Sequence, residues 1–254
     1  MLHLKESEVQ NLKIAIAQVS SIKGDIDENI STHLQAVKKA SELGVAYIVF
    51  PELSLTGYEP SIAKNFALSD DDIRLKPLID CAIKNNTTLA VGAPLRSVGL
   101  PNIGLIIISA SGIVESYAKM HLHPGEEQYF SGGEHHHHLI IGGTKIANAI
   151  CADTNNPQHA KNCFESGASV YIAGVMVTEG GYDNDSLAMK NYAKKYNMLV
   201  AMANHNHVTG GYKAVGKSAI WSTTGLLAQA GETDNALVVA TKVNNKWSAQ
   251  VIAI

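Results

Sequence analysis

The chain has 254 residues, of which 46% are hydrophobic and 17% charged, so it can bury a core and is too apolar for a disordered chain. Its formal net charge of −3 offers no broad basic field, which makes nucleic acid an unexpected partner. Residues 1–8 mix charges where an export signal needs a basic patch and an apolar run, and no apolar stretch reaches the roughly 20 residues that span a bilayer, so we expect a soluble, cytoplasmic protein without membrane contact.

The first half of the chain predicts an alternation of strands and helices. Apolar, β-branched runs predict strands at residues 13–19, 45–50 and 88–93. Apolar residues at helical spacing predict helices at 27–43 and 70–85. Two further apolar runs, 103–110 and 113–120, are separated by Ser111-Gly112 and predict a hairpin, so the sheet should be mixed.

The second half returns to this alternation after a loop expected at residues 121–138. The same patterns predict strands at 145–150, 168–173 and 198–204 and helices at 156–166 and 183–197, followed by a strand meander in the last 40 residues. Two halves of this kind predict an α/β fold with two mixed sheets packed on one another and helices outside. We expect a single domain over residues 1–254.

Three polar residues come at the ends of predicted strands. Cys151 follows a strand and precedes a predicted helix, where the helix dipole would lower the thiol pKa, although a cysteine is also a common inert core residue. Glu52 could be a partly buried general base or an ordinary exposed carboxylate, and Lys119 a functional ammonium or a solvated strand end. Cys81 and Cys163 fall in helical patterns, and an odd number of cysteines predicts no disulfide framework.

These residues lie within three ordered blocks, which are Phe50-Pro51-Glu52-Leu53-Ser54-Leu55-Thr56-Gly57-Tyr58, Tyr117-Ala118-Lys119-Met120-His121-Leu122 with Pro124-Gly125-Glu126-Glu127 and Phe130, and Ala149-Ile150-Cys151-Ala152-Asp153. The chain resembles the nitrilase superfamily of carbon-nitrogen hydrolases in these blocks, and the resemblance covers nearly its whole length.

The resemblance implies a four-layer α-β-β-α sandwich and a cysteine amidohydrolase that needs no cofactor. In such an enzyme Cys151 attacks, Glu52 is the general base, and Lys119 with the backbone N–H of Ala152 holds the oxyanion. A second glutamate, best matched by Glu126 and less well by Glu127, would orient the lysine or the substrate. The resemblance also implies a homodimer or larger homo-oligomer.

The substrate is expected to be a small amide that releases ammonia. Tyr58, Tyr129 and the segment 175–178 with Met176 lie beside the three blocks and are candidate pocket walls, with ordinary packing as the alternative. No arginine follows Cys151 closely and Ala152-Asp153 replaces the Trp-Glu of nitrile-hydrolysing relatives, so hydrolysis of an N-carbamoyl compound or a nitrile is the alternative rather than the first expectation.

Histidines offer a rival from another class of enzyme. His121, His123 and the tract His135 to His138 could form the centre of a metal-dependent hydrolase. The chain has no HExxH helix, and a polar loop can hold such a tract in solvent, so we expect no catalytic metal. A catalytically silent fold used for binding is a third hypothesis.

Overall fold

A computed structural model describes residues 11–254. The expectation that residues 1–8 carry no export signal lies outside this range. The elements in chain order, with η for a short 3-10 helix, are β1 (Leu12–Gln18), α1 (Ile26–Glu42), β2 (Tyr47–Val49), α2 (Pro60–Phe66), η1 (Ile73–Leu75), α3 (Lys76–Asn85), β3 (Thr88–Leu95), β4 (Asn102–Ile108), β5 (Val114–Ala118), η2 (Glu126–Gln128), β6 (His137–Ile141), β7 (Thr144–Ile150), η3 (Cys151–Asn155), α4 (Pro157–Glu165), β8 (Val170–Val175), α5 (Glu179–Tyr196), β9 (Leu199–Asn204), β10 (Val208–Thr209), β11 (Tyr212–Lys213), β12 (Ala219–Ser222), β13 (Gly225–Gln229), β14 (Ala236–Val243) and β15 (Lys246–Ala253).

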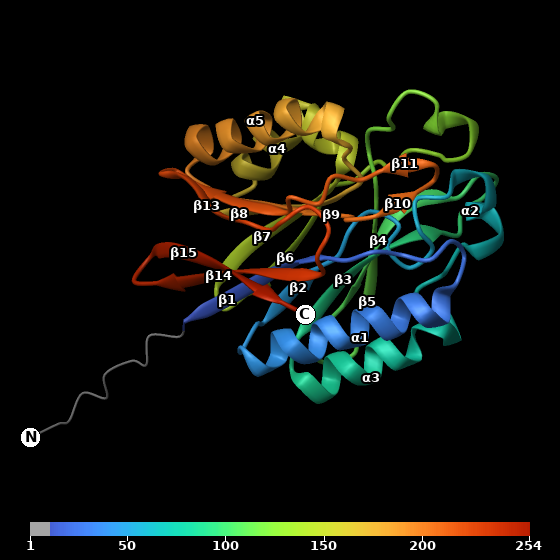
Figure 1. Ribbon diagram of the computed structural model, residues 1–254, viewed down its shortest axis with the longest axis horizontal. Helices are drawn as coiled ribbons and strands as arrows, with labels where there is room; N and C mark the ends of the chain where they lie inside the picture. Colours follow the sequence, from blue (N-terminus) through green and yellow to red (C-terminus); the bar gives the residue numbers. More distant parts are fainter. Residues whose placement is uncertain (1–10) are drawn as a thin grey trace, which may run out of the picture.

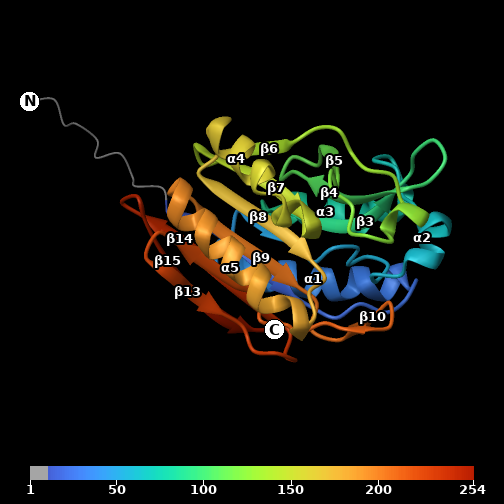
Figure 2. The ribbon, with the colours of Figure 1, turned by 90° about the horizontal axis from the view of Figure 1, so that it is seen from above.

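Two large mixed sheets form the centre of the molecule. The first has seven strands in the order β15-β14-β1-β2-β3-β4-β5, and the second has six in the order β13-β12-β9-β8-β7-β6. In each sheet three neighbouring strands are parallel, β1 to β3 in one and β7 to β9 in the other. Helices α1 and α3 cover the outer face of the first sheet and α4 and α5 that of the second (Figures 1 and 2). The predicted α-β-β-α sandwich is confirmed.

Three apolar layers hold these four layers together. Ile16 and Ile172 belong to the layer between the two sheets, Val37 and Leu78 to the layer under α1 and α3, and Met189 to the layer under α5. Side chains alternate between the two faces of a strand, so the central strands supply apolar residues to two layers at once. This explains why their sequences are nearly continuous apolar runs.

Some predicted bounds differ from the structure. Helix α3 begins at Lys76 instead of residue 70, because Pro77 suits a first helical turn and Asp72 caps the preceding η1. Helix α5 begins at Glu179, four residues before the predicted 183, because Gly180 and Gly181 weaken the helical pattern without preventing the helix. The predicted loop 121–138 ends early, since His137 and His138 begin strand β6 and pair with β7.

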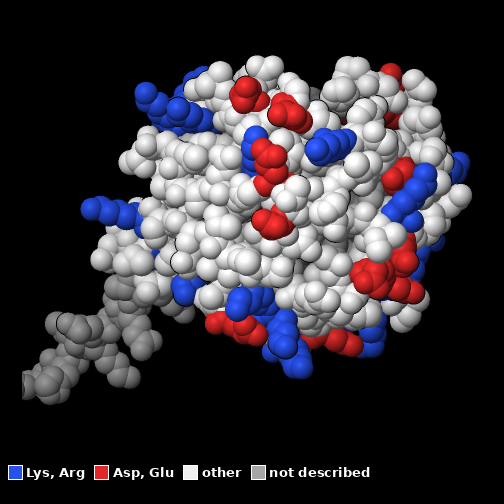
Figure 3. Space-filling view, in the orientation of Figure 1, with Lys and Arg blue, Asp and Glu red and all other residues white. Residues whose placement is uncertain are grey.

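The surface carries both signs of charge. Lysine and arginine side chains are interspersed with aspartate and glutamate on the face drawn in Figure 3, and large areas of that face carry neither. Within residues 11–254, the helices are all too short or too polar to cross a bilayer.

The segment that carries Glu52 is held between the two sheets by glycines. A Cβ atom on Gly174 of β8 would lie 2.5 Å from the carbonyl oxygen of Phe50. A Cβ on Gly92 of β3 would meet the backbone of Pro51 and Leu53 even more closely. The backbone of residues 50–53 approaches β3 on one side and β8 on the other so closely that only glycine fits at these two positions.

We predict that Gly174→Ala destabilises the protein, because backbone atoms cannot yield as a flexible side chain would. The expected loss is about 1–3 kcal/mol of unfolding free energy, measured by urea unfolding followed by circular dichroism. Gly180→Ala is the matched control, since its Cβ would meet nothing within 4 Å on helix α5. Equal stability of the two variants would contradict the proposed close packing.

Candidate active site

The three strand-end residues meet at one pocket. Glu52 follows β2 of the first sheet, Lys119 follows β5 of the same sheet, and Cys151 follows β7 of the second. Glu52 and Cys151 line a pocket of about 450 Å³, and Lys119 lies behind Glu52. Residues that are 99 positions apart in the chain thus face one cavity because the two sheets pack face to face.

A buried ammonium lies between two buried carboxylates. Lys119 Nζ donates to Glu52 Oε1 at 2.7 Å and to the two carboxylate oxygens of Glu126 at 2.9 and 2.8 Å. The side chains of Lys119 and Glu52 are fully buried, and that of Glu126 is 3% exposed. All three N–H donors of the ammonium therefore have charged acceptors, which is the condition under which a buried lysine stays protonated.

Glu126 is the better placed of the two candidate supporting glutamates. Its Oε1 also accepts a hydrogen bond from the Tyr58 hydroxyl at 2.7 Å, and its Oε2 accepts one from the backbone N–H of His123 at 2.8 Å. Glu127 is exposed and accepts from the backbone N–H of Gly125 instead. Of the two glutamates, Glu126 is the one that contacts Lys119.

The surroundings shift the pKa of Glu52 and Lys119 in the same direction. Burial raises the pKa of Glu52 to about 7; the Lys119 charge opposes this shift and the Glu126 charge adds to it. Burial lowers the pKa of Lys119, but the neighbouring charges of Glu52, Cys151 and Glu126 outweigh it and hold that pKa above its usual range. Glu52 therefore exchanges a proton near neutrality while Lys119 keeps its charge.

Glu52 has one carboxylate oxygen to spare. Its Oε2 is buried and makes no hydrogen bond with the residues from 11 to 254. The backbone carbonyl of Glu52 accepts a hydrogen bond at 2.7 Å from Nε2 of His205, a buried residue just beyond β9. His205 thus fixes the main chain of Glu52, and the Cys151 thiol is close enough to the carboxylate to lower its pKa.

Cys151 sits on a strained turn. It is the first residue of η3 and has a φ of 42°, in the left-handed region that non-glycine residues rarely adopt. The N–H of Ala152 falls in the first turn of η3, where backbone donors have no partner within the helix. The turn therefore exposes a thiol and a free backbone donor side by side.

The expectation that the helix dipole lowers the thiol pKa is wrong. Burial and the charge of Glu52 raise the pKa of Cys151 well above its usual value, and the charge of Lys119 offsets only part of this shift. A 3-10 helix of five residues has too small a dipole to compensate for them. The resting cysteine is a thiol that needs a base.

The remaining predicted residues line the same pocket. Tyr58, Tyr129 and Met176 are all on its wall, and Tyr129 is 40% exposed at its rim. Asn155 and Asp185 also line it and were not predicted from the sequence. Burial raises the pKa of Asp185, partly offset by a hydrogen bond from Asn155. Asp185 lies within a helical pattern, so nothing in its local sequence marks it as a pocket residue.

A third missed residue is Asp153, which organises the turn. This fully buried carboxylate accepts from the backbone N–H of Ile150 at 3.0 Å and from that of His121 at 2.9 Å. It also accepts from the Tyr117 hydroxyl at 2.6 Å. Asp153 therefore ties the end of β5, which leads into Lys119, to the end of β7, which leads into Cys151.

The histidine tract lies away from this pocket. His135, His136 and His137 line a separate cavity of about 280 Å³ that shares no wall residue with the pocket of Cys151. The sequence interpretation of the tract as a solvent-held loop is wrong for His136, His137 and His138, which are half-buried. Among the histidines of residues 11–254, His123 is the one that lines the pocket.

The fold and this site define a class of hydrolases. The chain matches the carbon-nitrogen hydrolase family over residues 13–248 and belongs to it. The resemblance to the nitrilase superfamily is thereby confirmed.

Solved structures of an amidase from Nesterenkonia sp. AN1 have the same fold. A double mutant in complex with acrylamide superposes with a TM-score of 0.85 at 22% identity, covering 94% of this chain and 93% of that one. Another mutant of that enzyme, with the acetamide moiety of fluoroacetamide added covalently at its active-site cysteine, has a TM-score of 0.83 at 23% identity, covering 91% and 90%.

Sequence relatives fall into more than one activity class. The chain is 24% identical to a nitrilase from Pyrococcus abyssi over 90% of this chain and 88% of that protein. It is also 24% identical to the glutamine-dependent NAD(+) synthetase of Thermotoga maritima, over 80% of this chain, and the match spans only 36% of the length of that relative.

We predict that the rate at which iodoacetamide alkylates Cys151 increases with pH. The midpoint of this increase, the rising limb of the pH profile, should lie near the Glu52 pKa of about 7. Below that pH Glu52 is protonated and cannot accept the thiol proton, whereas above it the thiolate forms by transfer to Glu52. Mass spectrometry of the Cys151 peptide over a pH series measures the rate.

Glu126→Gln should move this limb to lower pH, because it removes a negative charge that raises the pKa of Glu52. Glu127→Gln, a change of the exposed neighbour, should leave the limb in place. An unshifted limb in Glu126→Gln would contradict the electrostatic account.

Proposed function

We propose that this protein is a cysteine-dependent amidohydrolase that cleaves the carbon-nitrogen bond of a small, linear amide and releases ammonia. One observation carries the proposal, namely that Cys151 and Glu52 line one pocket, while the ammonium of Lys119 is hydrogen-bonded to the Glu52 carboxylate behind them. Family membership and the amidase relatives support it.

In the first half of the reaction, Glu52 Oε2 takes the Cys151 proton and the thiolate adds to the amide carbon. The carbonyl oxygen becomes an oxyanion, stabilised by the N–H of Ala152 and the charge of Lys119. Glu52 then returns the proton to the nitrogen, the carbon-nitrogen bond breaks, and ammonia leaves a thioester on Cys151.

In the second half, Glu52 takes a proton from water, and the hydroxide adds to the thioester carbon at the same oxyanion site. The carbon-sulfur bond breaks and the proton returns to Cys151, so that one water and one amide yield one carboxylic acid and one ammonia. A carboxylate with a pKa near 7 suits both directions of proton transfer. Glu126 acts as a positioning residue that keeps Lys119 charged and directed at Glu52.

The pocket favours a neutral or positively charged substrate. Its wall contains the acidic side chain of Asp185 but neither lysine nor arginine among the described residues. A substrate carboxylate would therefore lack a cationic partner there, which argues against N-carbamoyl amino acids. The similarity to a nitrilase keeps nitriles as the alternative, against which stands the Ala152-Asp153 pair.

The other hypotheses have less support. A metal-dependent hydrolase centred on the tract 135–138 would need those side chains at the reactive pocket, and they line a different cavity. A silent binding fold would not need a buried base beside a thiol on a strained turn. Cytoplasmic location and assembly into a homodimer or larger oligomer stay predictions.

We predict that Cys151→Ala lowers the rate of ammonia release at least about 10⁴-fold, because it removes the nucleophile. The wild-type protein is first screened on aliphatic amides, ω-amides, carbamoyl compounds and nitriles with ammonia as the readout. Mass spectrometry of the acid-quenched reaction should find the acyl group on Cys151.

Cys81→Ala is the matched control, because it removes a half-buried thiol that is outside the pocket and should leave turnover unchanged. Full turnover by Cys151→Ala would refute the proposal, and so would the absence of ammonia release from every substrate class.

We predict further that Asp185→Asn lowers kcat/KM about fivefold to tenfold for 4-aminobutanamide, whose ammonium would lie near this carboxylate. The neutral amide of similar length, pentanamide, should change less than about twofold. Asp183→Asn, an exposed change on the same helix, controls for general effects on α5. A loss of equal size for both amides would overturn the assignment of Asp185 to substrate charge.

A further inference from the structure

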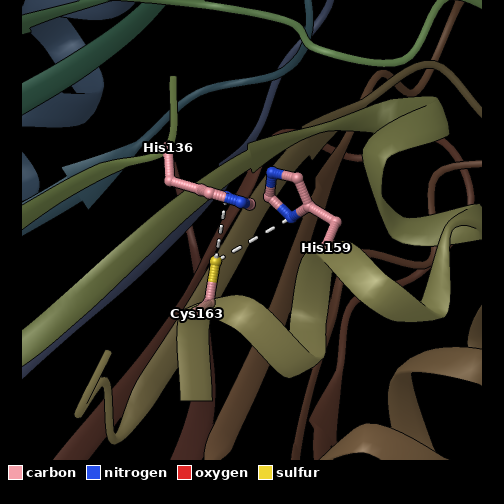
Figure 4. A group of neighbouring side chains, drawn as sticks. All are labelled: His136, His159 and Cys163. Atoms are coloured by element: carbon pink, nitrogen blue, oxygen red, sulfur yellow. Dashed lines mark hydrogen bonds between the residues drawn. The ribbon is translucent and has the colours of Figure 1, made fainter. Parts of the chain in front are cut away.

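A second group of reactive side chains lies behind the Cys151 turn. His159 and Cys163 are one turn apart on helix α4, and His136 reaches them from the segment before β6 (Figure 4). Cys163 Sγ is 3.7 Å from Nδ1 of His136 and 3.9 Å from Nδ1 of His159. Cys163 and His159 are buried, and His136 is half-buried.

Hydrogen bonds fix which nitrogen of His159 is free. The Tyr117 hydroxyl donates to the Asp153 carboxylate at 2.6 Å, so the same oxygen accepts from Nε2–H of His159 at 3.1 Å. Nδ1 of His159 is then left with a lone pair, which faces Cys163 and the Tyr171 hydroxyl at 3.0 Å. An imidazole whose far N–H is held in this way is typical of a metal ligand.

His136 differs from His159 at its far nitrogen. Its Nε2 accepts a hydrogen bond from the Asn162 carboxamide N–H at 3.3 Å, so its ring proton is on Nδ1, which faces the thiol. Metal binding moves that proton to Nε2 and turns the Asn162 carboxamide so that its oxygen accepts it. Both histidines therefore present Nδ1 to the same sulfur, and each has a polar partner at its other nitrogen. The partners of the two imidazoles come from different elements, β5 for Tyr117 and α4 for Asn162.

The spacing of these atoms suits a tetrahedral ion. Bonds of about 2.3 Å to sulfur and about 2.05 Å to nitrogen at a tetrahedral angle separate the two ligand atoms by about 3.6 Å. The observed separations of 3.7 and 3.9 Å differ from this by a few tenths of an ångström. The donor atoms of the three residues all lie within 4.8 Å of one another, so small side-chain rotations would bring them onto one ion.

The site also has an entrance. His136 lines the cavity of about 280 Å³, together with its neighbours Glu134, His135 and His137. An ion can reach His136 from this cavity, and a water molecule in it can supply a fourth ligand. Two imidazoles and one thiolate form a donor set that suits Zn²⁺ better than Mg²⁺ or Ca²⁺, which prefer oxygen.

We propose that His136, His159 and Cys163 form a zinc-binding site separate from the pocket of Cys151. Binding replaces the proton of the Cys163 thiol with a zinc-sulfur bond and releases that proton to solvent, with no oxidation or reduction. The Tyr171 hydroxyl gives up its hydrogen bond to Nδ1 of His159. The ion stabilises the fold by joining α4 to the segment before β6, and it takes no part in the chemistry at Cys151.

The test uses the full chain after dialysis against a chelator, titrated with zinc chloride and, in parallel, with cobalt chloride. We expect one equivalent of zinc per chain, a melting temperature raised by several degrees, and a thiolate-to-cobalt charge-transfer absorption. Binding should be lost in His136→Ala and Cys163→Ser, and retained in His135→Ala and Cys81→Ser.

These controls distinguish the site from adventitious binding. His135 is an exposed member of the same tract, and Cys81 is a half-buried cysteine on another helix. Binding that survives His136→Ala but falls in His135→Ala would assign it to the exposed tract and overturn the proposal. Absence of the charge-transfer band from the wild-type protein would overturn it as well.

His136→Ala guards against a folding artefact, because His136 is half-buried at a cavity wall whereas Cys163 is in the core. Its fold is checked by circular dichroism and by the alkylation rate of Cys151, which should match the wild type. Ammonia release from a substrate amide by the chelated wild-type protein should be unchanged. Loss of turnover restored by zinc would refute the separation of the two sites.

Discussion

The structure depends on one arrangement of buried charges, in which the ammonium of Lys119 lies between the carboxylates of Glu52 and Glu126. Removing such groups from water costs several kcal/mol per ion, and the cost is offset only when every donor and acceptor has a good partner. Lys119 meets this condition with three charged contacts at 2.7 to 2.9 Å. All three side chains are buried where the two sheets pack on one another.

The same arrangement sets the protonation of the site. Two carboxylates and one ammonium carry an excess of negative charge when all are ionised, and burial makes that excess unfavourable. Glu52 relieves it by accepting a proton near neutrality. Glu126 accepts hydrogen bonds from Lys119, the Tyr58 hydroxyl and the backbone N–H of His123. The excess charge also keeps Cys151 a thiol. Above the pKa of Glu52 the carboxylate and the thiol therefore hold one proton between them, and Lys119 does not compete for it.

The sequence reveals this site only in part. Glu52, Lys119 and Cys151 could be found because each lies within three residues of a strand end and in a family motif, and the strands themselves are apolar runs that a local pattern detects. Asp153 and Asp185 could not be ranked above other acidic residues, since their roles come from contacts with distant segments. The thiol pKa was predicted with the wrong sign because the local dipole is visible in sequence, whereas burial and the charge of Glu52 are not. Strand β6 was missed because its first two residues are histidines, which interrupt the apolar pattern.

Asp153 explains how the proposed zinc site can lie close to the Cys151 turn without sharing its chemistry. Its carboxylate accepts from the backbone N–H of Ile150 on one side and from the Tyr117 hydroxyl, which His159 also contacts, on the other. This chain of hydrogen bonds couples the position of His159 to that of the turn, because it fixes the backbone where the turn begins. It transmits little charge, since Asp153 is already surrounded by donors and lies outside the wall of the reactive pocket. An ion at His159 would therefore stabilise the backbone position of the Cys151 turn. It would leave the proton held between Glu52 and Cys151 unaffected.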